Sequence, residues 1–231
     1  MTVLLLALDT STSAVTVALH DGSSVLAEST VVGDRRHGEL LAPGIDEVLS
    51  QAGKKPAELT AVVAGVGPGP FTGLRVGVAT ALAFRAALAI PVYGICSLDA
   101  IAWRADVEGE FIVVTDARRR EVYWAEYTRR DRRRAATVAG VAKPSVVLAE
   151  AAGRPVIGPG AHLVTAQAAH DSAAHDSAGS VGTRDVVVSA GALAEIAVER
   201  IRSGGELLQP RPLYLRRPDA VAPGAPKKVL A

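Results

Sequence analysis

The chain has 231 residues, of which 49% are hydrophobic and 4% aromatic, and its formal net charge is +1. This supplies enough aliphatic material for a buried α/β core, and the balanced charge excludes a general attraction to nucleic acid or acidic membranes. The single cysteine, Cys96, excludes an internal disulfide and a cysteine-rich zinc site. Arg75 and Arg85 interrupt the most apolar stretch, so we expect a cytoplasmic protein with no membrane partner.

The first half of the chain predicts three short strands and then alternating helices and strands. Residues 3–9, 13–20 and 24–32 are expected strands, with "DTSTS" and Asp21-Gly22 as the turns between them. Helical spacing of apolar residues follows from residue 38 to about 53, and residues 59–66 form a β-branched run typical of a buried strand. A glycine-rich loop then leads into a helix over residues 72–89 and a strand over 90–95.

The second half predicts a smaller set of elements. A short helix begins near Ser97, and residues 110–117 and 121–128 form a hairpin with Arg118-Arg119-Arg120 as its turn. A helix over 145–152, short strands over 155–158 and 185–188, and a last helix over 190–205 follow. Residues 166–182, with a tandem "HDSA" repeat, are expected to be a flexible loop, and the tail after Leu215 is expected to fray.

The glycine-rich loop is a candidate anion site. Gly67, Gly69 and Thr72 lie where a strand meets a helix N-terminus, which presents backbone N–H groups and the positive end of the helix dipole. Against this, the loop has neither the ending of a P-loop nor a GxGxxG pattern. Gly73, Gly77 and Ala81, four residues apart, would equally suit close helix packing, so the residues leave both readings open.

The turn after the first strand is a second candidate. Asp9 ends an apolar strand, and Thr10 and Ser11 follow it. Asp9 could reach a magnesium ion through water while the two hydroxyls bind phosphate oxygens. Asx and Ser/Thr turns have the same sequence pattern, so a purely structural turn is also consistent.

Eight arginines fall within residues 118–134, and arginine suits RNA phosphates. The expected strand over residues 121–128 separates them into a turn at 118–120 and a group at 129–134. Two small patches on solvated loops are the favoured interpretation. His170 and His175 lie in the expected flexible loop, where ordering a ligand pair would cost conformational entropy, so no metal site is expected there.

Several segments together carry a family resemblance. "ALDTSTSAVTVAL", "HGELLAPGIDEVL", "VVAGVGPGPFTGLRVGVATALAFRAALAIPVYGICSLDAIA", "TDARRREVYWAEY" and the late "PLYLR" resemble the TsaB (YeaZ) family. The resemblance implies an α/β, two-lobed actin-like ATPase (ASKHA) fold, with mixed β-sheets flanked by helices and a reduced second lobe. Residues 1–100 would form the first lobe, which binds the partner, and residues 101–231 the smaller second lobe with a C-terminal helix and flexible tail.

The resemblance also implies a function. The chain would be a scaffold and dimerisation subunit in tRNA threonylcarbamoyladenosine biosynthesis, binding and activating the TsaD transferase. A TsaE-like ATPase would join, tRNA would be reached through the complex, and the chain alone would form a homodimer. The first-lobe helices would supply the partner-binding residues, which are His37, Leu40, Leu41, Gly73, Arg75, Val76, Gly77, Thr80 and Ala81.

The catalytic paralogue of this family carries "HLEGH" at the junction where this chain has Ser97 to Ile101. Because no imidazole remains there, the resemblance implies no metal site and no catalytic residue in this chain. ATP and magnesium would bind only weakly or through the partner complex. The alternative is a small ATPase or kinase that uses Asp9 and Thr10 with magnesium.

Overall fold

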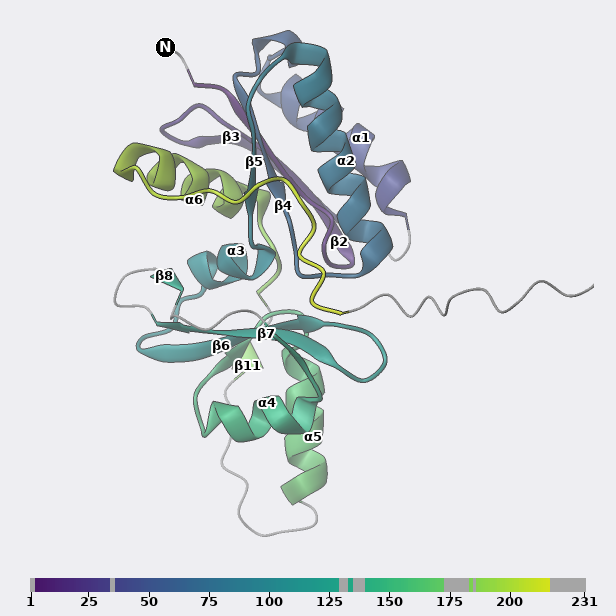
Figure 1. Ribbon diagram of the computed structural model, residues 1–231, viewed down its shortest axis with the longest axis vertical. Coiled ribbons are helices and arrows are strands. Elements are labelled where there is room, and N and C mark those ends of the chain that lie inside the picture. Colours follow the sequence, from purple (N-terminus) through teal and green to yellow (C-terminus); the bar gives the residue numbers. More distant parts are fainter. Residues whose placement is uncertain are drawn as a thin grey trace, which may run out of the picture.

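Two β-sheets, each flanked by helices, lie one above the other along the long axis of the molecule (Figure 1). The computed structural model describes residues 3–33, 36–128, 133–134, 140–172, 183–184 and 186–216. The first sheet has the order β3-β2-β1-β4-β5, with antiparallel pairing of β1 to β2 and β2 to β3 and parallel pairing of β1 to β4 and β4 to β5. Its strands are β1 (Leu5–Asp9), β2 (Ala14–His20), β3 (Val25–Val32), β4 (Ala61–Gly65) and β5 (Val92–Ile95).

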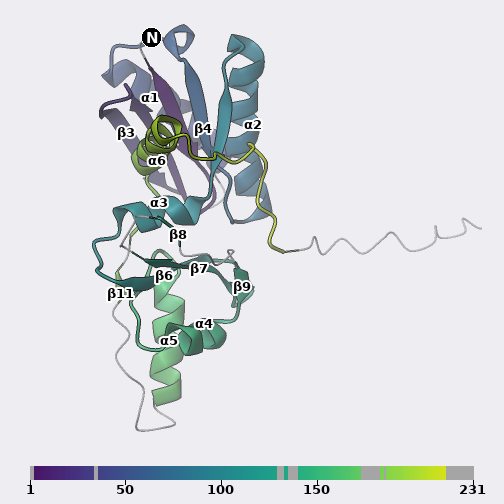
Figure 2. The same cartoon turned by 60° about the vertical axis from the view of Figure 1, so that its left-hand side comes forward.

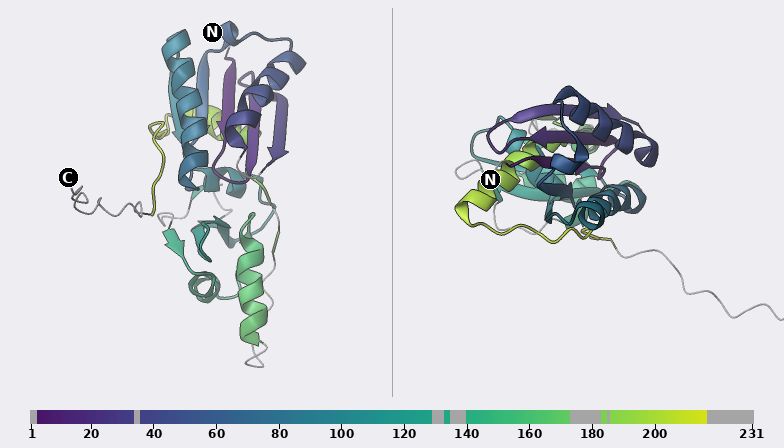
Figure 3. Two further views of the ribbon diagram at one scale, coloured as in Figure 1. Left: turned by 90° about the vertical axis from the view of Figure 1, so that its right-hand side faces the viewer. Right: turned by 90° about the horizontal axis from the view of Figure 1, so that it is seen from above.

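Helices cover both faces of this first sheet. The helices α1 (His37–Gln51) and α2 (Phe71–Leu88) lie on one face (Figure 3), and α6 (Ala190–Ser203) crosses the other (Figure 2). Every residue of β1, β2 and β4 is buried, as expected for central strands sandwiched between two helical layers. The short helix η1 (Pro56–Glu58) connects α1 to β4. The predicted first-half elements are confirmed with shifts of one or two residues at their ends.

The second sheet has the order β11-β10-β6-β7-β8, and β9 also pairs with β7. The helix α3 (Ser97–Arg104) packs between the two sheets, whereas α4 (Pro144–Ala151) and α5 (Ala161–Ser172) cover the outer face (Figure 1). Its strands are β6 (Glu110–Asp116), β7 (Val122–Thr128), β8 (Arg133–Arg134), β9 (Gly140–Ala142), β10 (Val156–Ile157) and β11 (Thr183–Arg184). The architecture confirms the predicted α/β fold with two mixed sheets.

Two predictions in the second half need correction. The strand expected over residues 185–188 is wrong, because the described strand is β11 and residues 186–189 run without sheet pairing into α6. Val188 is nevertheless buried, so its side chain joins the core that the apolar run indicated. The loop expected over residues 166–182 is wrong in its first part, because α5 continues to Ser172 through alanine-rich sequence of high helix propensity. Residues 173–182 and the tail from residue 217 lie outside the described residues.

The chain returns to the first sheet after the second one is complete. Residues 205–216, here called the strap, leave the end of α6 and pass the free edge of β5, where Gly94 and Leu208 exchange two backbone hydrogen bonds of 2.8 and 3.0 Å. Leu213 N–H then donates to the Val66 carbonyl at 2.8 Å. The lobe boundary near residue 100 stays a prediction, and the structure adds that α6 and the strap pack on the first sheet.

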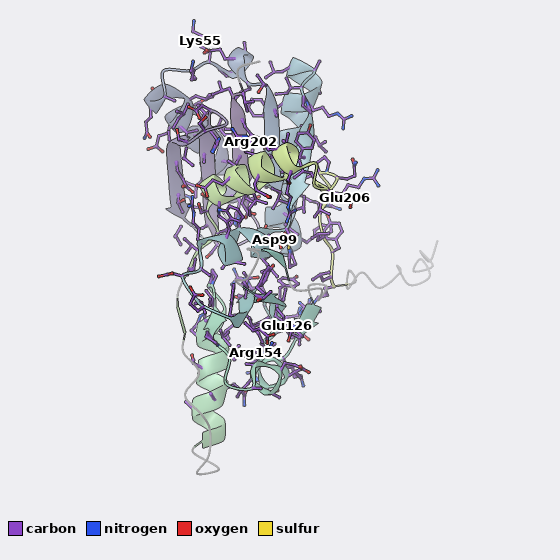
Figure 4. The ribbon with its side chains drawn as sticks, turned by 90° about the vertical axis from the view of Figure 1, so that its left-hand side faces the viewer. Lys55, Asp99, Glu126, Arg154, Arg202 and Glu206 are labelled. Carbon is purple, nitrogen blue, oxygen red and sulfur yellow. The ribbon has the colours of Figure 1, made fainter. Side chains whose placement is uncertain are left out.

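One charged group joins three elements at the centre of the molecule. Asp99 on α3 accepts a hydrogen bond from the Tyr127 hydroxyl of β7 at 2.9 Å and pairs with Arg200 of α6 at 3.0 Å. Its side chain, labelled in Figure 4, is 9% exposed, so the carboxylate is largely removed from water. A buried carboxylate needs partners of this kind, because desolvation without them is costly.

We expect Arg200→Ala to lower the free energy of unfolding by about 2 kcal/mol, because it leaves the Asp99 carboxylate short of its cation. Tyr127→Phe removes one hydrogen bond to the same carboxylate and should cost about 1 kcal/mol. Urea denaturation of the three proteins measures both values. An Arg200→Ala variant that unfolds at the parental midpoint would show that this ion pair does not hold α6 in place.

Candidate functional site

The carboxylate of Asp9 lies at the end of β1 and is fully buried. Its Oδ2 accepts a hydrogen bond of 2.5 Å from the Ser97 hydroxyl, and its Oδ1 accepts from the Ser11 N–H at 2.6 Å and the Ser11 hydroxyl at 2.7 Å. Burial raises the pKa of Asp9 above its ordinary value, although the hydrogen bonds from Ser97 and Ser11 act in the opposite direction. Both oxygens are therefore engaged by the protein itself.

Ser97 connects this carboxylate to the glycine loop. Its hydroxyl donates to Asp9 and accepts from the Gly67 N–H at 3.0 Å, while its own N–H donates to the Gly67 carbonyl at 2.8 Å. A side chain at Gly65 would overlap the Asp9 carboxylate, so this position requires glycine. Through these contacts Ser97 closes the junction of β1, β4 and α3.

The Thr10 hydroxyl is bound to the backbone of α2. It donates to the Gly73 carbonyl at 2.7 Å and accepts from the Gly77 N–H at 2.9 Å. These are the two groups that an α-helix ordinarily pairs with each other, so the hydroxyl bridges the donor and the acceptor of one helical turn. A Cβ at Gly77 would lie 2.6 Å from the Thr10 Oγ1, and one at Gly73 would lie 2.5 Å from the Thr10 carbonyl oxygen.

The glycine loop is likewise folded against its own chain. Gly67 has a φ of +88°, and Gly69 is so close to the Ser11 carbonyl that a side chain there would overlap it. Both glycines are buried, whereas Thr72 is exposed in the first turn of α2. The structure thus brings the predicted phosphate residues Asp9, Thr10, Ser11, Gly67 and Gly69 together. Their hydrogen bonds stay within the chain: Asp9 binds Ser11 and Ser97, Thr10 binds the backbone of α2, and Gly67 binds Ser97.

A cavity of about 270 Å³ remains between the two sheets, beside this junction. It is smaller than the roughly 300–1,000 Å³ of typical ligand pockets. Its polar lining comes from the "DTSTS" turn and from the end of β6, where Asp116 accepts the Arg118 N–H at 2.6 Å. The lining residues are Thr12, Ser13, Val32, Pro70, Asp116, Arg118, Pro159 and His162. Over the described part of the chain, no three His, Cys, Asp or Glu side chains are arranged to hold a metal ion.

The predicted partner residues divide into two groups. Leu41, Gly73, Gly77 and Ala81 are buried, and they face the first sheet or the Thr10 turn. They are therefore not accessible on the surface of this chain, and the small residues of α2 allow close packing inside it. The accessible or half-buried members are His37, Leu40, Arg75, Val76 and Thr80. His37 donates through Nε2 to the Thr12 carbonyl at 2.7 Å, which ties the start of α1 to the same turn.

The outward face of α2 is unusually apolar. Phe71 is 46% exposed and Leu82 is 39% exposed, and exposed alanines lie between and beyond them at helical spacing. Within the described residues, α2 is the one helix whose length and composition would allow a membrane crossing, which is weak evidence because ordinary core helices meet the same test. Its inner face packs on the sheet through Val78 and Ala81, so the apolar residues on the outer face need another explanation.

Sequence reasoning missed the roles of Ser97, Asp99 and Tyr214. Ser97 and Asp99 lie two residues apart in α3, and the fold brings Ser97 to the Asp9 carboxylate and Asp99 to Arg200. Tyr214 of the strap stacks on Phe71 with ring centroids 5.2 Å apart, and its hydroxyl accepts from Arg75 Nε at 3.0 Å. No local signal could have found that contact, because 139 residues separate Arg75 from Tyr214.

The sheet topology and the junction at Asp9 indicate the class of protein. Two mixed sheets flanked by helices, which meet at the Asp9 carboxylate and the glycine loop, form the predicted two-lobed actin-like ATPase fold. The chain belongs to the TsaD family, described as tRNA N6-adenosine threonylcarbamoyltransferase, whose family model matches residues 25–197.

Individual relatives sharpen this placement. The chain is 54% identical over 125 residues to an uncharacterized protein of Mycobacterium tuberculosis H37Rv, a match that covers 53% of this chain and 58% of that protein. It is 34% identical over 128 residues to the tRNA threonylcarbamoyladenosine biosynthesis protein TsaB of Escherichia coli K12, covering 54% and 55%. The chain therefore spans a little over half the length of these curated relatives.

A solved structure matches nearly the whole chain. YeaZ from Pseudomonas aeruginosa has a TM-score of 0.74 at 28% identity, over 92% of this chain and 100% of that one. Together with the TsaB relatives, this confirms the resemblance to TsaB and YeaZ proteins that the sequence motifs predicted.

The close approach of Thr10 to α2 leads to a prediction about two glycines. Gly77→Ala should lower the free energy of unfolding by about 1–3 kcal/mol, because its Cβ would crowd the Thr10 hydroxyl. Gly38→Ala in α1 is the matched control, since nothing lies within 4 Å of its Cβ. That control should stabilise the protein by up to about 1 kcal/mol through helix propensity. Thermal and urea unfolding would contradict the packing if both variants changed stability in the same direction.

The raised pKa of Asp9 predicts a pH dependence. The folded protein keeps a proton on Asp9 at pH values above 3.8, the pKa of this group in the unfolded chain. The stability that this protonation contributes is fully present below pH 3.8 and is lost as the pH rises through the pKa of Asp9 in the folded state. Asp9→Asn is neutral at every pH. The free energy of unfolding of the parent should therefore decline relative to Asp9→Asn from acidic to neutral pH. A parent that gains stability over the variant as pH rises would reverse the sign and rule out this effect of burial.

Proposed function

We propose that the chain is a non-catalytic scaffold and dimerisation subunit in the biosynthesis of threonylcarbamoyladenosine in tRNA, where it binds and activates a TsaD-type transferase. Its relative from Escherichia coli carries the name of that pathway. The observation that carries the proposal is the apolar outward face of α2, which includes the exposed side chains of Phe71 and Leu82. An apolar surface of this kind on a packed helix is typical of a protein–protein contact.

The proposed contact surface combines two unlike helices. The outer side of α2 offers small and apolar side chains, while exposed Glu39, Asp46 and Glu47 line α1. His37, Leu40, Arg75, Val76 and Thr80 lie on or beside this face and are its candidate anchors. A second copy of the chain would use the same face in a two-fold arrangement, so homodimer and heterodimer should exclude each other.

Closure of the Asp9 turn supports a role without chemistry of its own. Asp9 is fully buried, and its oxygens accept hydrogen bonds from Ser97 and Ser11. Thr10 is committed to the backbone of α2. The ATPase or kinase alternative requires Asp9 to reach hydrated magnesium and Thr10 to reach phosphate, so each residue would first have to give up these contacts. We therefore favour ATP and magnesium binding in the complex rather than in this chain.

The other partners follow from the same proposal. A TsaE-like ATPase would join the pair, tRNA would be the substrate of the assembly, and the work would take place in the cytoplasm. Sedimentation velocity of the chain alone and mixed with the transferase from the same organism, with and without ATP and magnesium, tests the first step. We expect self-association to give way to a one-to-one complex. Two proteins that sediment independently in every condition would refute the partner role.

A single substitution can locate the contact surface. Ala83 is exposed on α2, and Ala83→Arg adds a bulky charge to the apolar face without entering the core. We expect it to weaken pairing at least about tenfold, equivalent to ~1.4 kcal/mol. Ala149→Arg makes the same change at an exposed position of α4, on the second sheet, and should leave pairing unchanged. Equal affinity of both variants for the transferase would place the contact elsewhere.

A further inference from the structure

The turn between β6 and β7 has an unusual backbone. Arg118, Arg119 and Arg120 have φ values of +62°, +56° and +61°, so three successive non-glycine residues adopt the left-handed conformation. Glycine and asparagine are the residues that adopt this conformation readily, and arginine has no such preference. All three arginines are exposed. Strained backbone of this kind is concentrated at functional sites, because the side chains are retained at a cost in stability.

The surrounding contacts hold this turn in place. Asp116 Oδ1 accepts the Arg118 N–H at 2.6 Å, and the Ala117 N–H donates to the Glu121 carbonyl at 2.9 Å. Arg216, at the end of the strap, donates to the Ala117 carbonyl at 3.2 Å and forms an ion pair with Glu121. The backbone of the turn is therefore held in place, in part by a residue that lies almost a hundred positions further along the chain.

An aromatic pair lies two residues along the strap from Arg216. Tyr214 is 45% exposed and stacks on Phe71, which is 46% exposed, and the Arg75 guanidinium lies 3.7 Å from the centre of the Phe71 ring. Two residues of extended chain span about 7 Å. Exposed rings and arginines are thus neighbours on one surface, which we call the arginine–tyrosine surface. It consists of Phe71, Arg75, Arg118, Arg119, Arg120, Tyr214 and Arg216.

This surface is strongly basic in a chain of nearly balanced charge. It contains five arginines in a chain whose formal net charge is +1, and among them Arg118 pairs with Asp116 and Arg216 pairs with Glu121. Guanidinium groups bind phosphate oxygens in a bidentate manner, and exposed aromatic rings stack on unpaired bases. An acidic peptide would satisfy the arginines but would leave the stacked rings without a role.

We propose that the arginine–tyrosine surface binds RNA directly, with the turn arginines on phosphates and Tyr214 beside an unpaired base. This RNA contact would give the scaffold its own hold on the molecule to be modified. The identity of the RNA as tRNA rests on the proposed function. RNA binding can be measured on this chain alone. Failure here and failure of pairing with the transferase are therefore separate results.

The test combines two substitutions that remove positive charge and place residues that favour the left-handed conformation in the turn. Arg119→Asn with Arg120→Gly places Asn-Gly where the backbone is left-handed, so the melting temperature should stay the same or rise. Fluorescence anisotropy with a labelled RNA stem–loop should show about tenfold weaker binding. The dependence of log affinity on log salt should also become shallower, by about 0.7 for each lost phosphate contact in single-stranded RNA.

Lys54→Ala with Lys55→Ala is the matched control, because it removes the same charge at the far end of the first lobe (Figure 4). Its affinity for the stem–loop should change less than twofold. Equal losses of RNA affinity in both double variants would show that net charge alone explains the effect, and this would overturn the proposal. Unchanged RNA binding in the turn variant, with weaker pairing to the transferase by sedimentation, would overturn it in favour of a protein contact.

Tyr214 provides the test for the base. Tyr214→Phe keeps the ring and loses the hydroxyl bound to Arg75, whereas Tyr214→Ala loses both. Affinity for the stem–loop should fall about fivefold or more in Tyr214→Ala and little in Tyr214→Phe, and neither change should affect a fully paired duplex of equal length. Equal affinities of the two variants for the stem–loop would exclude stacking on this ring.

Discussion

The contact of one threonine hydroxyl with two backbone groups of a helix is the constraint on which the first lobe depends. Thr10 bridges the carbonyl of Gly73 and the N–H of Gly77, which requires α2 to lie against the end of β1 with no side chain between them. Beside it, Ser97 fixes the Asp9 carboxylate and the glycine loop together. Strand, loop and two helices thus meet at buried polar groups that satisfy one another, and such a network allows one arrangement.

The closed junction around Asp9 and Thr10 determines which groups of the first lobe remain accessible. The Asp9 turn and the glycine loop bind their own chain, and the cavity beside them measures about 270 Å³. Because Gly73, Gly77 and Ala81 pack inward, the opposite side of α2 presents Phe71, Leu82 and exposed alanines, together with Arg75 and Arg85. The same helix therefore both closes this junction and presents the surface that we propose for a partner.

The two lobes are joined by contacts between distant segments. Asp99 pairs with Arg200 and Tyr127, and the strap runs from Leu208 at β5 to Arg216 at the β6–β7 turn. A partner bound on α2 would consequently contact a helix that is linked through Tyr214 to the strap. The proposed RNA surface and the proposed protein surface therefore meet at Phe71 and Arg75, so a scaffold could hold both molecules in a defined relative position.

The sequence by itself determined the elements of the first lobe and the family. The spacing of apolar residues and the turn-forming residues predicted β1 to β5, α1 and α2, because both are local properties of the sequence. It could not decide which side of α2 is buried, because Gly73 and Gly77 suit an internal and an external neighbour equally. Nor could it extend α5 to Ser172, where polar repeat residues resemble a loop. The pairing of Asp9 with Ser97, Asp99 with Arg200 and Phe71 with Tyr214 was decided by tertiary structure alone, because each joins residues more than eighty positions apart.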